Sequence, residues 1–187
     1  MTGLSEIKQA ARTAGFARRK QAHAQAGPGA AGHLSQVLAG YRGVALAGYM
    51  PIRTEIDPIP AMEEATAHGL VGVPVIRATG QALVFSRWQP DGAMVAGPFG
   101  ARIPAQEDLI VPEILIVPLV AFDLNGGRLG YGGGFYDRTL EALRKERATL
   151  AIGFAYAAQQ AGDLPLEPTD QPLDMIVTED GVHEFPR

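Results

Sequence analysis

The chain has 187 residues, of which 47% are hydrophobic and 19% charged, and its formal net charge is −4. This balance indicates an ordered globular protein with a sizeable core, and its acidic sign argues against a general nucleic-acid binder. Because the sequence contains no cysteine, disulfides, thiolate catalysis and cysteine-ligated zinc are excluded.

The N-terminal residues are polar and basic, and they lack the apolar core of a secretory signal. No apolar run approaches the roughly 20 residues that span a bilayer. We therefore expect a cytoplasmic protein with no membrane partner.

A long helix is expected from residue 4 to about residue 26, because helix formers dominate this segment and Gly27-Pro28-Gly29 ends it. Lys8 and Arg12 are four residues apart and share one helical face, which suggests a common anionic partner. Taken alone, these cations and the basic run RRK at residues 18–20 fit a solvated helix face better than a binding site.

Short apolar runs alternate with helical stretches along the rest of the chain. Strands are predicted at residues 44–49, 71–76, 82–88, 114–122, 149–154 and 175–178, and helices at residues 33–39, 60–68 and 135–147. Residues 92–104 are interrupted by glycine and proline, which predicts a long loop. The alternation predicts an α/β fold with a mostly parallel sheet, in a single domain spanning residues 1–187.

The predicted strand at residues 44–49 runs directly into the segment MPIRTEIDP. The prolines of this segment exclude regular structure, so Glu55 and Asp57 are expected on a loop just past the carboxyl end of the strand. Ligands of open α/β sheets bind at this edge. The loop is therefore a candidate binding segment.

The stretch from Leu115 to Leu140, LIVPLVAFDLNGGRLGYGGGFYDRTL, joins an apolar run to a predicted helix through a loop with six glycines. The loop also contains Arg128, and Asp137 follows it. Glycines let successive backbone N–H groups turn toward one ligand, and the first amides of a helix lack intrahelical partners. The stretch therefore predicts a phosphate cradle, with a simple turn as the alternative. It matches neither the GxxxxGK[ST] motif nor the Rossmann glycine spacing.

Several segments resemble one known family when they are taken together. The long segment PLVAFDLNGGRLGYGGGFYDRTL is accompanied by KQAAR, YMPIRTEIDP, IGFAYAAQQ and LPLEPTDQPLDMIVTEDGV, in the family's order. The chain closely resembles the 5-formyltetrahydrofolate cyclo-ligase family, also called methenyltetrahydrofolate synthetase. The resemblance implies a single-domain, Rossmann-like three-layer α/β fold with a mostly parallel central sheet.

The resemblance also implies a reaction. It is the ATP- and Mg²⁺-dependent conversion of 5-formyltetrahydrofolate to 5,10-methenyltetrahydrofolate, with release of ADP and phosphate. The formyl oxygen is phosphorylated and N10 then attacks the formyl carbon. The expected substrate carries a single glutamate or a polyglutamate tail, and the expected protein is a monomer that binds no nucleic acid.

Roles for individual residues follow from the same resemblance. The implied ATP contacts are Lys8, Arg12, Arg128, Leu129, Gly130, Tyr131, Gly132, Gly133, Gly134, Phe135, Tyr136 and Asp137. The implied folate contacts are Met50, Glu55, Phe99 and Phe135, and the implied magnesium ligands are Asp137 and Asp170. Arg128 is the expected catalytic residue. Some members carry a lysine where this chain has Gly133, which leaves Arg128 and Lys8 as the main cations for the phosphate. The basic run at residues 18–20 is a weaker candidate for the glutamate tail than for a solvated face.

Two other functions stay open. One is a non-catalytic folate- or nucleotide-binding module on the same fold, and the other is a different small-molecule kinase or ligase that uses the same cradle. Glu55, Arg128, Asp137 and Asp170 are all present, which speaks against decay of the site.

Overall fold

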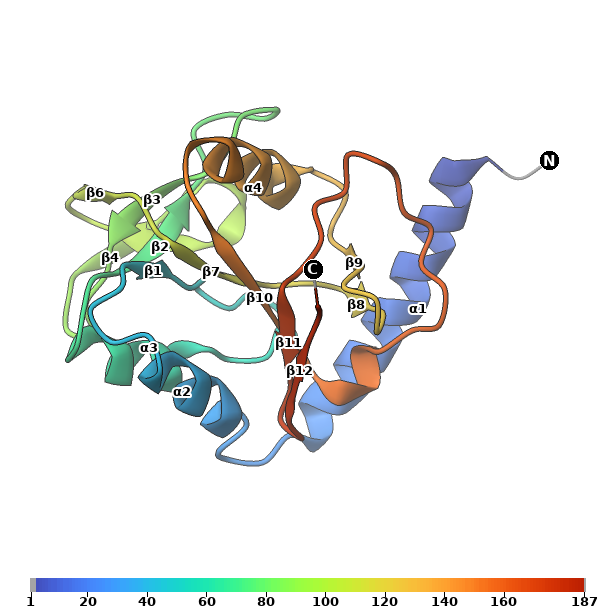
Figure 1. Cartoon of the computed structure of the whole chain (residues 1–187), viewed down its shortest axis with the longest axis horizontal. Coiled ribbons are helices and arrows are strands. Elements are labelled where there is room, and N and C mark those ends of the chain that lie inside the picture. Colours follow the sequence, from blue (N-terminus) through green and yellow to red (C-terminus); the bar gives the residue numbers. More distant parts are fainter. Residues whose placement is uncertain (1–2, 187) are drawn as a thin grey trace.

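The computed structural model describes residues 3–186, so residues 1, 2 and 187 of the predicted domain lie outside it. Its centre is a sheet of eight strands in the order β12-β11-β10-β7-β1-β2-β3-β6 (Figure 1). These strands are β1 (Leu46–Ala47), β2 (Val71–Val75), β3 (Val84–Arg87), β6 (Leu109–Ile110), β7 (Ile114–Val117), β10 (Leu150–Phe154), β11 (Met175–Val177) and β12 (Val182–Glu184). The five strands from β11 to β2 are parallel, and β12, β3 and β6 join the edges through antiparallel pairings. The predicted α/β fold with a mostly parallel sheet is confirmed.

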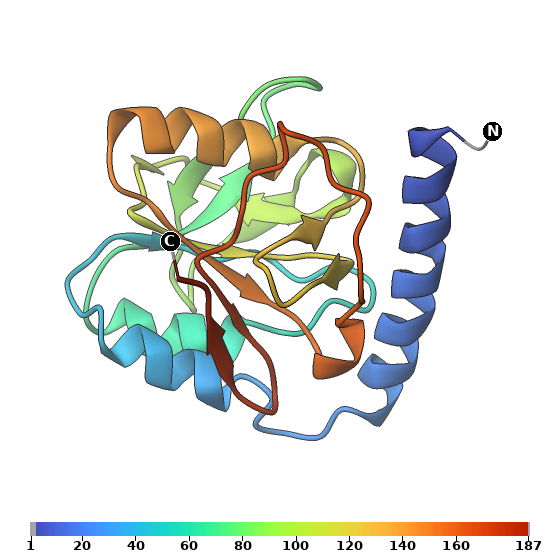
Figure 2. The ribbon, with the colours of Figure 1, turned by 45° about the vertical axis from the view of Figure 1, so that its right-hand side comes forward.

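Helices cover both faces of this sheet. The helices are α1 (Leu4–Gln25), α2 (Gly32–Ala39), α3 (Ile59–Thr66) and α4 (Phe135–Glu146), with a short 3-10 turn η2 (Ala157–Gln159). In Figure 1, α2 and α3 lie together on one face and α4 lies on the other, so the molecule has three layers. Figure 2 shows α1 standing beside these layers, next to the segment that contains β8 and β9.

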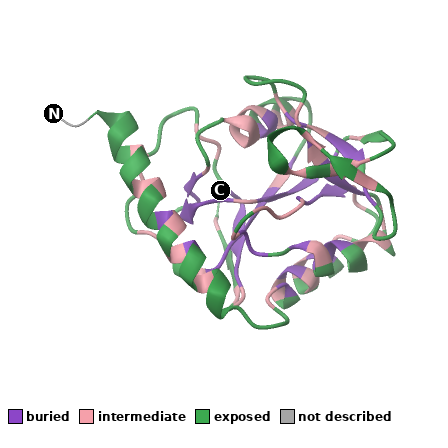
Figure 3. Cartoon of the chain, turned by 180° about the vertical axis from the view of Figure 1, so that it is seen from behind, coloured by how far each residue is buried: buried purple, intermediate pink, exposed green. Residues whose placement is uncertain are grey.

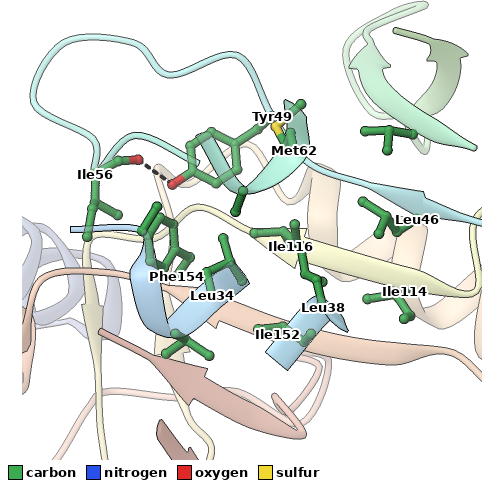
Figure 4. Packing of buried hydrophobic residues seen from close by; sticks show 14 of the residues in the cluster. Leu34, Leu38, Leu46, Tyr49, Ile56, Met62, Ile114, Ile116, Ile152 and Phe154 are labelled. Carbon is green, nitrogen blue, oxygen red and sulfur yellow. Dashed lines mark hydrogen bonds between the residues drawn. The ribbon is translucent and has the colours of Figure 1, made fainter. Parts of the chain in front are cut away.

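Strand β7 shows why the central apolar run has no polar interruptions. Ile114 and Ile116 pack into the cluster on the side of α2 and α3 (Figure 4). Leu115 and Val117 pack into the other cluster, which includes Leu140 of α4. Side chains alternate between the faces of a strand, and a strand that is covered on both faces is apolar at every position.

Residues 92–104 form a hairpin, so the predicted long loop is wrong. Strand β4 (Met94–Ala96) pairs antiparallel with β5 (Arg102–Pro104), and the turn η1 (Pro98–Gly100) joins them. The glycines and prolines that predicted a loop lie mainly at the tip and the ends of the hairpin. Phe99 lies at the tip with a φ of 63°.

The predicted single strand at residues 114–122 is divided in two. Strand β7 ends at Val117, because Pro118 follows and has no N–H to extend the ladder. The chain then forms a second hairpin from β8 (Ala121–Phe122) and β9 (Arg128–Leu129). The backbone N–H of Gly127 donates to Asp123 Oδ1 at 2.8 Å, which closes the turn between them. The first two glycines of the glycine-rich stretch therefore form a hairpin turn, and the other four lie between β9 and α4.

Helix α1 is largely solvent-exposed, as the mostly green and pink colour of its ribbon in Figure 3 shows. Its buried residues are Gly15 and Arg19. A Cβ atom at Gly15 would lie 2.7 Å from a side-chain carbon of Val120, so glycine allows the helix to approach the body closely. Within residues 3–186, no helix combines the length and the apolar character that a membrane crossing requires.

Candidate active site

A cavity of about 990 Å³ opens at the carboxyl ends of the central strands. Strand β1 pairs with β2 on one side and with β7 on the other, so the strand order reverses between β1 and β7. Tyr49 and Met50, which follow β1, and Pro118, which follows β7, line the cavity together with parts of α1, the β4–β5 hairpin and the loop before α4. Ligands of open α/β sheets bind at such a switch point.

Arg128 is the buried cation of this cavity, with 6% of its surface exposed. Its Nη2 atom donates to Asp137 Oδ1 at 2.5 Å, whereas its buried Nε atom has no partner among the described residues. Burial lowers the pKa of Arg128, and the carboxylates of Asp137 and Asp170 counteract this effect. The guanidinium remains charged because arginine does not lose its proton in proteins. One N–H of a buried cation is thus left for a ligand.

The loop Gly130–Gly134 leads directly into α4. Gly132 and Gly134 adopt positive φ angles of 100° and 70°, which glycine tolerates without steric cost. Gly134 is the N-cap residue of α4, so the free amides of the first helical turn face the end of the helix where the loop lies. A helix N-terminus favours anions.

Two arginines hold the backbone of this loop. The Nε atom of Arg12 donates to the carbonyl oxygen of Gly130 at 2.9 Å, and Nη2 of Arg138 donates to that of Gly133 at 2.6 Å. Both arginines line the cavity. The predicted cradle therefore consists of glycine backbone, a helix N-terminus and cations from α1 and α4. Arg138 is an addition to the residues that the sequence motifs predict.

Lys8 and Asp170 meet on the same wall. The ammonium group of Lys8 forms ion pairs with Glu167 and with Asp170, the latter at 3.2 Å. Burial alone would lower the pKa of Lys8, but its bonds to the two carboxylates raise it overall. Asp170 is brought close to Asp137 because the N–H of Gln171 donates to Asp137 Oδ1 at 2.8 Å.

The two predicted magnesium ligands fit an incomplete metal site. Asp137 uses Oδ1 for its two hydrogen bonds and Asp170 uses Oδ2, so each carboxylate has a second oxygen without a partner in the described chain. No group of three His, Cys, Asp or Glu side chains within residues 3–186 could hold a metal. Mg²⁺ is usually bound by one or two carboxylates and completed by phosphate oxygens and water. The donor set matches that pattern.

Glu55, on the loop after β1, also lines the cavity and is 5% exposed; we call this loop, residues 50–55, the Glu55 wall. Its Oε1 atom accepts from the hydroxyl of Tyr131 at 2.7 Å, and its Oε2 atom accepts from the N–H of Ile52 at 2.9 Å. Burial raises the pKa of Glu55, while these two hydrogen bonds and the charge of Arg19 oppose the rise. The loop predicted from the MPIRTEIDP segment thus positions a carboxylate whose two oxygens are both oriented.

The burial of Arg19 behind the cavity is the feature that sequence reasoning missed. The basic run predicts a solvated face, but Arg19 is 1% exposed. Its Nε atom donates to Thr54 Oγ1 at 3.0 Å and its Nη1 atom donates to Tyr131 Oη at 2.5 Å. A signal exists in the sequence, since Arg19 follows Arg12 by seven residues and therefore shares its helical face. The rest of the basic run, Arg18 and Lys20, is half-buried and exposed, respectively.

Phe99 and Phe135 lie together at the cavity, and Phe135 also packs against the core cluster that contains Leu140. Phe99 is 63% exposed at the tip of its hairpin, and its ring centroid lies 6.1 Å from that of Phe135 with an interplanar angle of 61°. The guanidinium of Arg138 lies 5.2 Å from the Phe135 centroid. The two rings offer an aromatic surface to a flat ligand.

Tyr136 contributes a buried hydroxyl that has no hydrogen-bond partner in the described part of the chain. Burial raises the pKa of Tyr136, so the group stays neutral and can donate to a ligand. All the predicted site residues, from Lys8 to Asp170, line this one cavity. Their individual roles stay predictions.

Comparisons with known proteins agree with this geometry. The model of the 5-formyltetrahydrofolate cyclo-ligase family matches residues 5–179. The 5-formyltetrahydrofolate cyclo-ligase of Haemophilus influenzae is 43% identical over 114 residues, which are 57% of this chain and 60% of that protein. The Escherichia coli K12 protein of the same name is 34% identical over 147 residues, 75% of this chain and 80% of the relative.

Solved structures show the same fold. The NMR structure of the 5,10-methenyltetrahydrofolate synthetase of Aquifex aeolicus aligns with a TM-score of 0.73 and 26% identity, over 97% of this chain and 94% of that one. The Mycoplasma pneumoniae synthetase aligns with a TM-score of 0.64 and 22% identity, over 92% and 98% of the chains, and supports the fold alone. Because the family model matches most of its length, as the glycine-rich motif and its neighbours predicted, the chain belongs to the 5-formyltetrahydrofolate cyclo-ligase family of enzymes.

Proposed function

We propose that the chain converts 5-formyltetrahydrofolate to 5,10-methenyltetrahydrofolate with ATP and Mg²⁺, releasing ADP and phosphate. One observation carries the proposal. A single cavity of about 990 Å³ combines an anion-binding wall, built by the glycine loop and Arg128, with the buried carboxylate of the Glu55 wall, and two phenylalanine rings lie at the same cavity. A site for one ligand would need only one of these walls.

The anion-binding wall suits the phosphates of ATP. The loop Gly130–Gly134 and the first turn of α4 supply backbone N–H donors, and Lys8, Arg12 and Arg128 supply positive charge. Catalysis of phosphoryl transfer consists mainly of positioning and charge neutralisation, so it needs no nucleophilic side chain. Mg²⁺, held by Asp137 and Asp170, would add positive charge at the phosphates.

The Glu55 wall suits the folate ring. An ionised carboxylate only accepts hydrogen bonds, so Glu55 can hold the N–H groups of the pterin. Met50 of the same loop lines the cavity, and Phe99 and Phe135 can cover the flat ring system.

With ATP and 5-formyltetrahydrofolate side by side in the cavity, the γ-phosphoryl group can reach the formyl oxygen. A formamide oxygen is a poor leaving group, so the γ-phosphoryl group is transferred to it and ADP leaves. The N10 amine then attacks the formyl carbon, a C–N bond forms, the N10 proton passes to solvent, and the C–O bond to phosphate breaks. Arg128 stabilises the charge that develops on the transferred phosphoryl group. The bound substrate supplies N10 at high effective concentration.

The test is turnover of 5-formyltetrahydrofolate with MgATP, followed by the absorbance of the methenyl product. Formation of this product with matching ADP release supports the proposal, and its absence with folded, magnesium-supplied protein contradicts it. Tight folate binding by calorimetry without ATP consumption would identify a binding module instead. ATP consumption with another acceptor only would identify a different kinase or ligase. The monomeric state, the cytoplasmic location and the use of polyglutamylated substrate stay predictions.

A further inference from the structure

Arg19 carries a buried charge whose direct partners are all neutral. Its guanidinium donates to Thr54 Oγ1, to the carbonyl oxygen of Leu119 at 3.4 Å and to Tyr131 Oη. Its Cζ atom also lies 5.2 Å from the ring centroid of Phe16 and 5.4 Å from that of Tyr131. Across residues 3–186, no carboxylate forms an ion pair with Arg19. A buried charge without a counter-charge is unfavourable, so its retention needs an explanation.

The counter-charge lies one hydroxyl group away. Tyr131 accepts from Arg19 at 2.5 Å and donates to Glu55 at 2.7 Å. An arginine can only donate, and a tyrosine hydroxyl has a single proton. The proton of Tyr131 is therefore directed toward Glu55, and the contacts form a one-way chain from Arg19 through Tyr131 to Glu55. We call these three residues the Arg19 relay.

The Arg19 relay leaves Glu55 ready for a particular kind of ligand. One carboxylate oxygen holds the Tyr131 hydroxyl and the other holds the N–H of Ile52, which fixes the plane of the carboxylate. Each oxygen keeps acceptor capacity, since a carboxylate has about four lone-pair sites. A ligand edge with two adjacent N–H donors, such as the 2-amino-4-oxopyrimidine of folate, matches this arrangement.

We propose that Arg19 is a positioning residue that fixes the charge and the orientation of the Glu55 carboxylate for recognition of the folate ring. The proposal rests on the proposed function. It assigns a role to α1 beyond the phosphate contacts of Lys8 and Arg12. Arg19 touches neither the folate nor the reacting atoms, and it acts through Tyr131.

The charge of Arg19 matters because Glu55 is buried. Besides Arg19, the groups that interact electrostatically with Glu55 are Arg53, Tyr49, Tyr131 and Tyr136. Arg19 and Arg53 are the cations among them, and Arg128 and Asp57 act on the neighbouring tyrosines. Without Arg19, the pKa of Glu55 rises further, so the ionised form that accepts the ligand is populated only at higher pH.

The experiment compares Arg19→Met, Arg19→Lys and Tyr131→Phe with the control Lys20→Met. The control removes one positive charge from the next position of α1, where the side chain is exposed. KM values for folate and for ATP, folate affinity by calorimetry and thermal unfolding are measured between pH 6 and pH 8. Tyr131→Phe keeps Arg19 and its aromatic contacts but removes the bridging hydroxyl, so it tests the relay even if Arg19→Met does not fold.

We expect Arg19→Met and Tyr131→Phe to raise the folate KM and Kd about tenfold to a hundredfold. Arg19→Met should change the ATP KM by less than about threefold. Tyr131 also belongs to the glycine loop, so its replacement is read on folate binding alone. The ratio of variant to wild-type KM for folate should be larger at pH 6 than at pH 8, and Arg19→Lys should recover part of the loss. Lys20→Met should match the wild type.

A different pattern would overturn the proposal. One such result is unchanged folate affinity in folded Arg19→Met and Tyr131→Phe. Another is an equal loss of folate and ATP affinity in Arg19→Met, with a pH profile parallel to that of the wild type. Either result would mean that Arg19 only attaches α1 to the body. These outcomes are distinct from failure of the proposed function. If the proposed function is wrong, the wild type itself forms no methenyl product. The folate affinities of the wild type and the variants, measured by calorimetry, then still test the Arg19 relay. A wild type that binds no folate contradicts both proposals.

Discussion

The two walls of the cavity handle charge in opposite ways. On the glycine-loop wall, a cation and a carboxylate are paired directly: Arg128 Nη2 lies 2.5 Å from Asp137 Oδ1. The carboxylate of this pair is partly exposed. At the Glu55 wall, Arg19 and Glu55 are both buried and meet through the hydroxyl of Tyr131, which the glycine loop contributes.

The difference indicates how each wall can serve its ligand. Asp137 and Asp170 are partly exposed, so they can exchange their ion pairs with Arg128 and Lys8 for Mg²⁺, and the cations are then free for phosphate. A relay whose two ends, Arg19 and Glu55, are buried and whose donors and acceptors are each assigned reorganises little and therefore suits recognition of one rigid ring. One wall adapts to its ligand, and the other is preformed.

The largest expected effect comes from removing the buried cation of the adaptable wall. Arg128→Ala should lower kcat about a hundredfold to a thousandfold, because the transferred phosphoryl group loses its charge stabilisation. Steady-state kinetics measure this change, with circular dichroism as a check on folding. Lys145→Ala, which removes an exposed cation from α4, is the matched control. Near-full activity of a folded Arg128→Ala protein would exclude Arg128 from the reaction.

A smaller effect, confined to one ligand, is expected on the preformed wall. Glu55→Gln should raise the folate KM about tenfold to a hundredfold, because a pterin donor loses a charged acceptor. The wild-type folate KM should itself increase as the pH falls toward the raised pKa of Glu55, since the protonated carboxyl accepts poorly. In Glu55→Gln, the folate KM should not increase in this way at low pH.

Asp57→Asn is the control for this change. Asp57 lies on the same loop but is exposed, and it caps the N–H of Ile59 at 2.9 Å. Its replacement should leave the folate KM and its pH dependence unchanged. An equal loss in both variants would place the effect in the loop as a whole rather than in Glu55.

Asp170→Asn should raise the half-saturating Mg²⁺ concentration about tenfold, because one carboxylate of the proposed metal site loses its charge. Magnesium titrations of turnover, and calorimetry of MgATP binding, measure the effect. Glu184→Gln, an exposed change on β12, serves as the control. The same magnesium dependence in Asp170→Asn and wild type would remove Asp170 from the metal site.

The smallest effect is expected from the exposed aromatic ring. Phe99→Ala should raise the folate KM about threefold to tenfold through lost stacking, and it should change Tm by less than about 2 °C because the side chain is mostly exposed. Leu124→Ala, at an exposed apolar position on the β8–β9 hairpin, is the control. A large fall in Tm with unchanged KM would make Phe99 a packing residue.

Local sequence patterns account for much of the fold. Helix α1 ends at Gln25, close to the predicted end at residue 26, because the stop signal Gly27-Pro28-Gly29 is local. The apolar run at β7 predicts a strand covered on both faces, since each position must pack. The hairpin of β4 and β5 was missed because strand pairing depends on a partner and not only on composition.

The family, the α/β class and the candidate site residues can be read from the sequence, because the glycine-rich motif, the MPIRTEIDP loop and the cations of α1 follow one another along the chain. The roles of the site residues stay predictions. The burial of Arg19 and its link to Glu55 through Tyr131 appear only in the folded structure. Tyr131 lies 112 residues from Arg19 and 76 from Glu55 in sequence. The reason is physical: local spacing defines the face of a helix, but whether a charge on that face meets solvent or a buried counter-charge depends on what the rest of the chain packs against it.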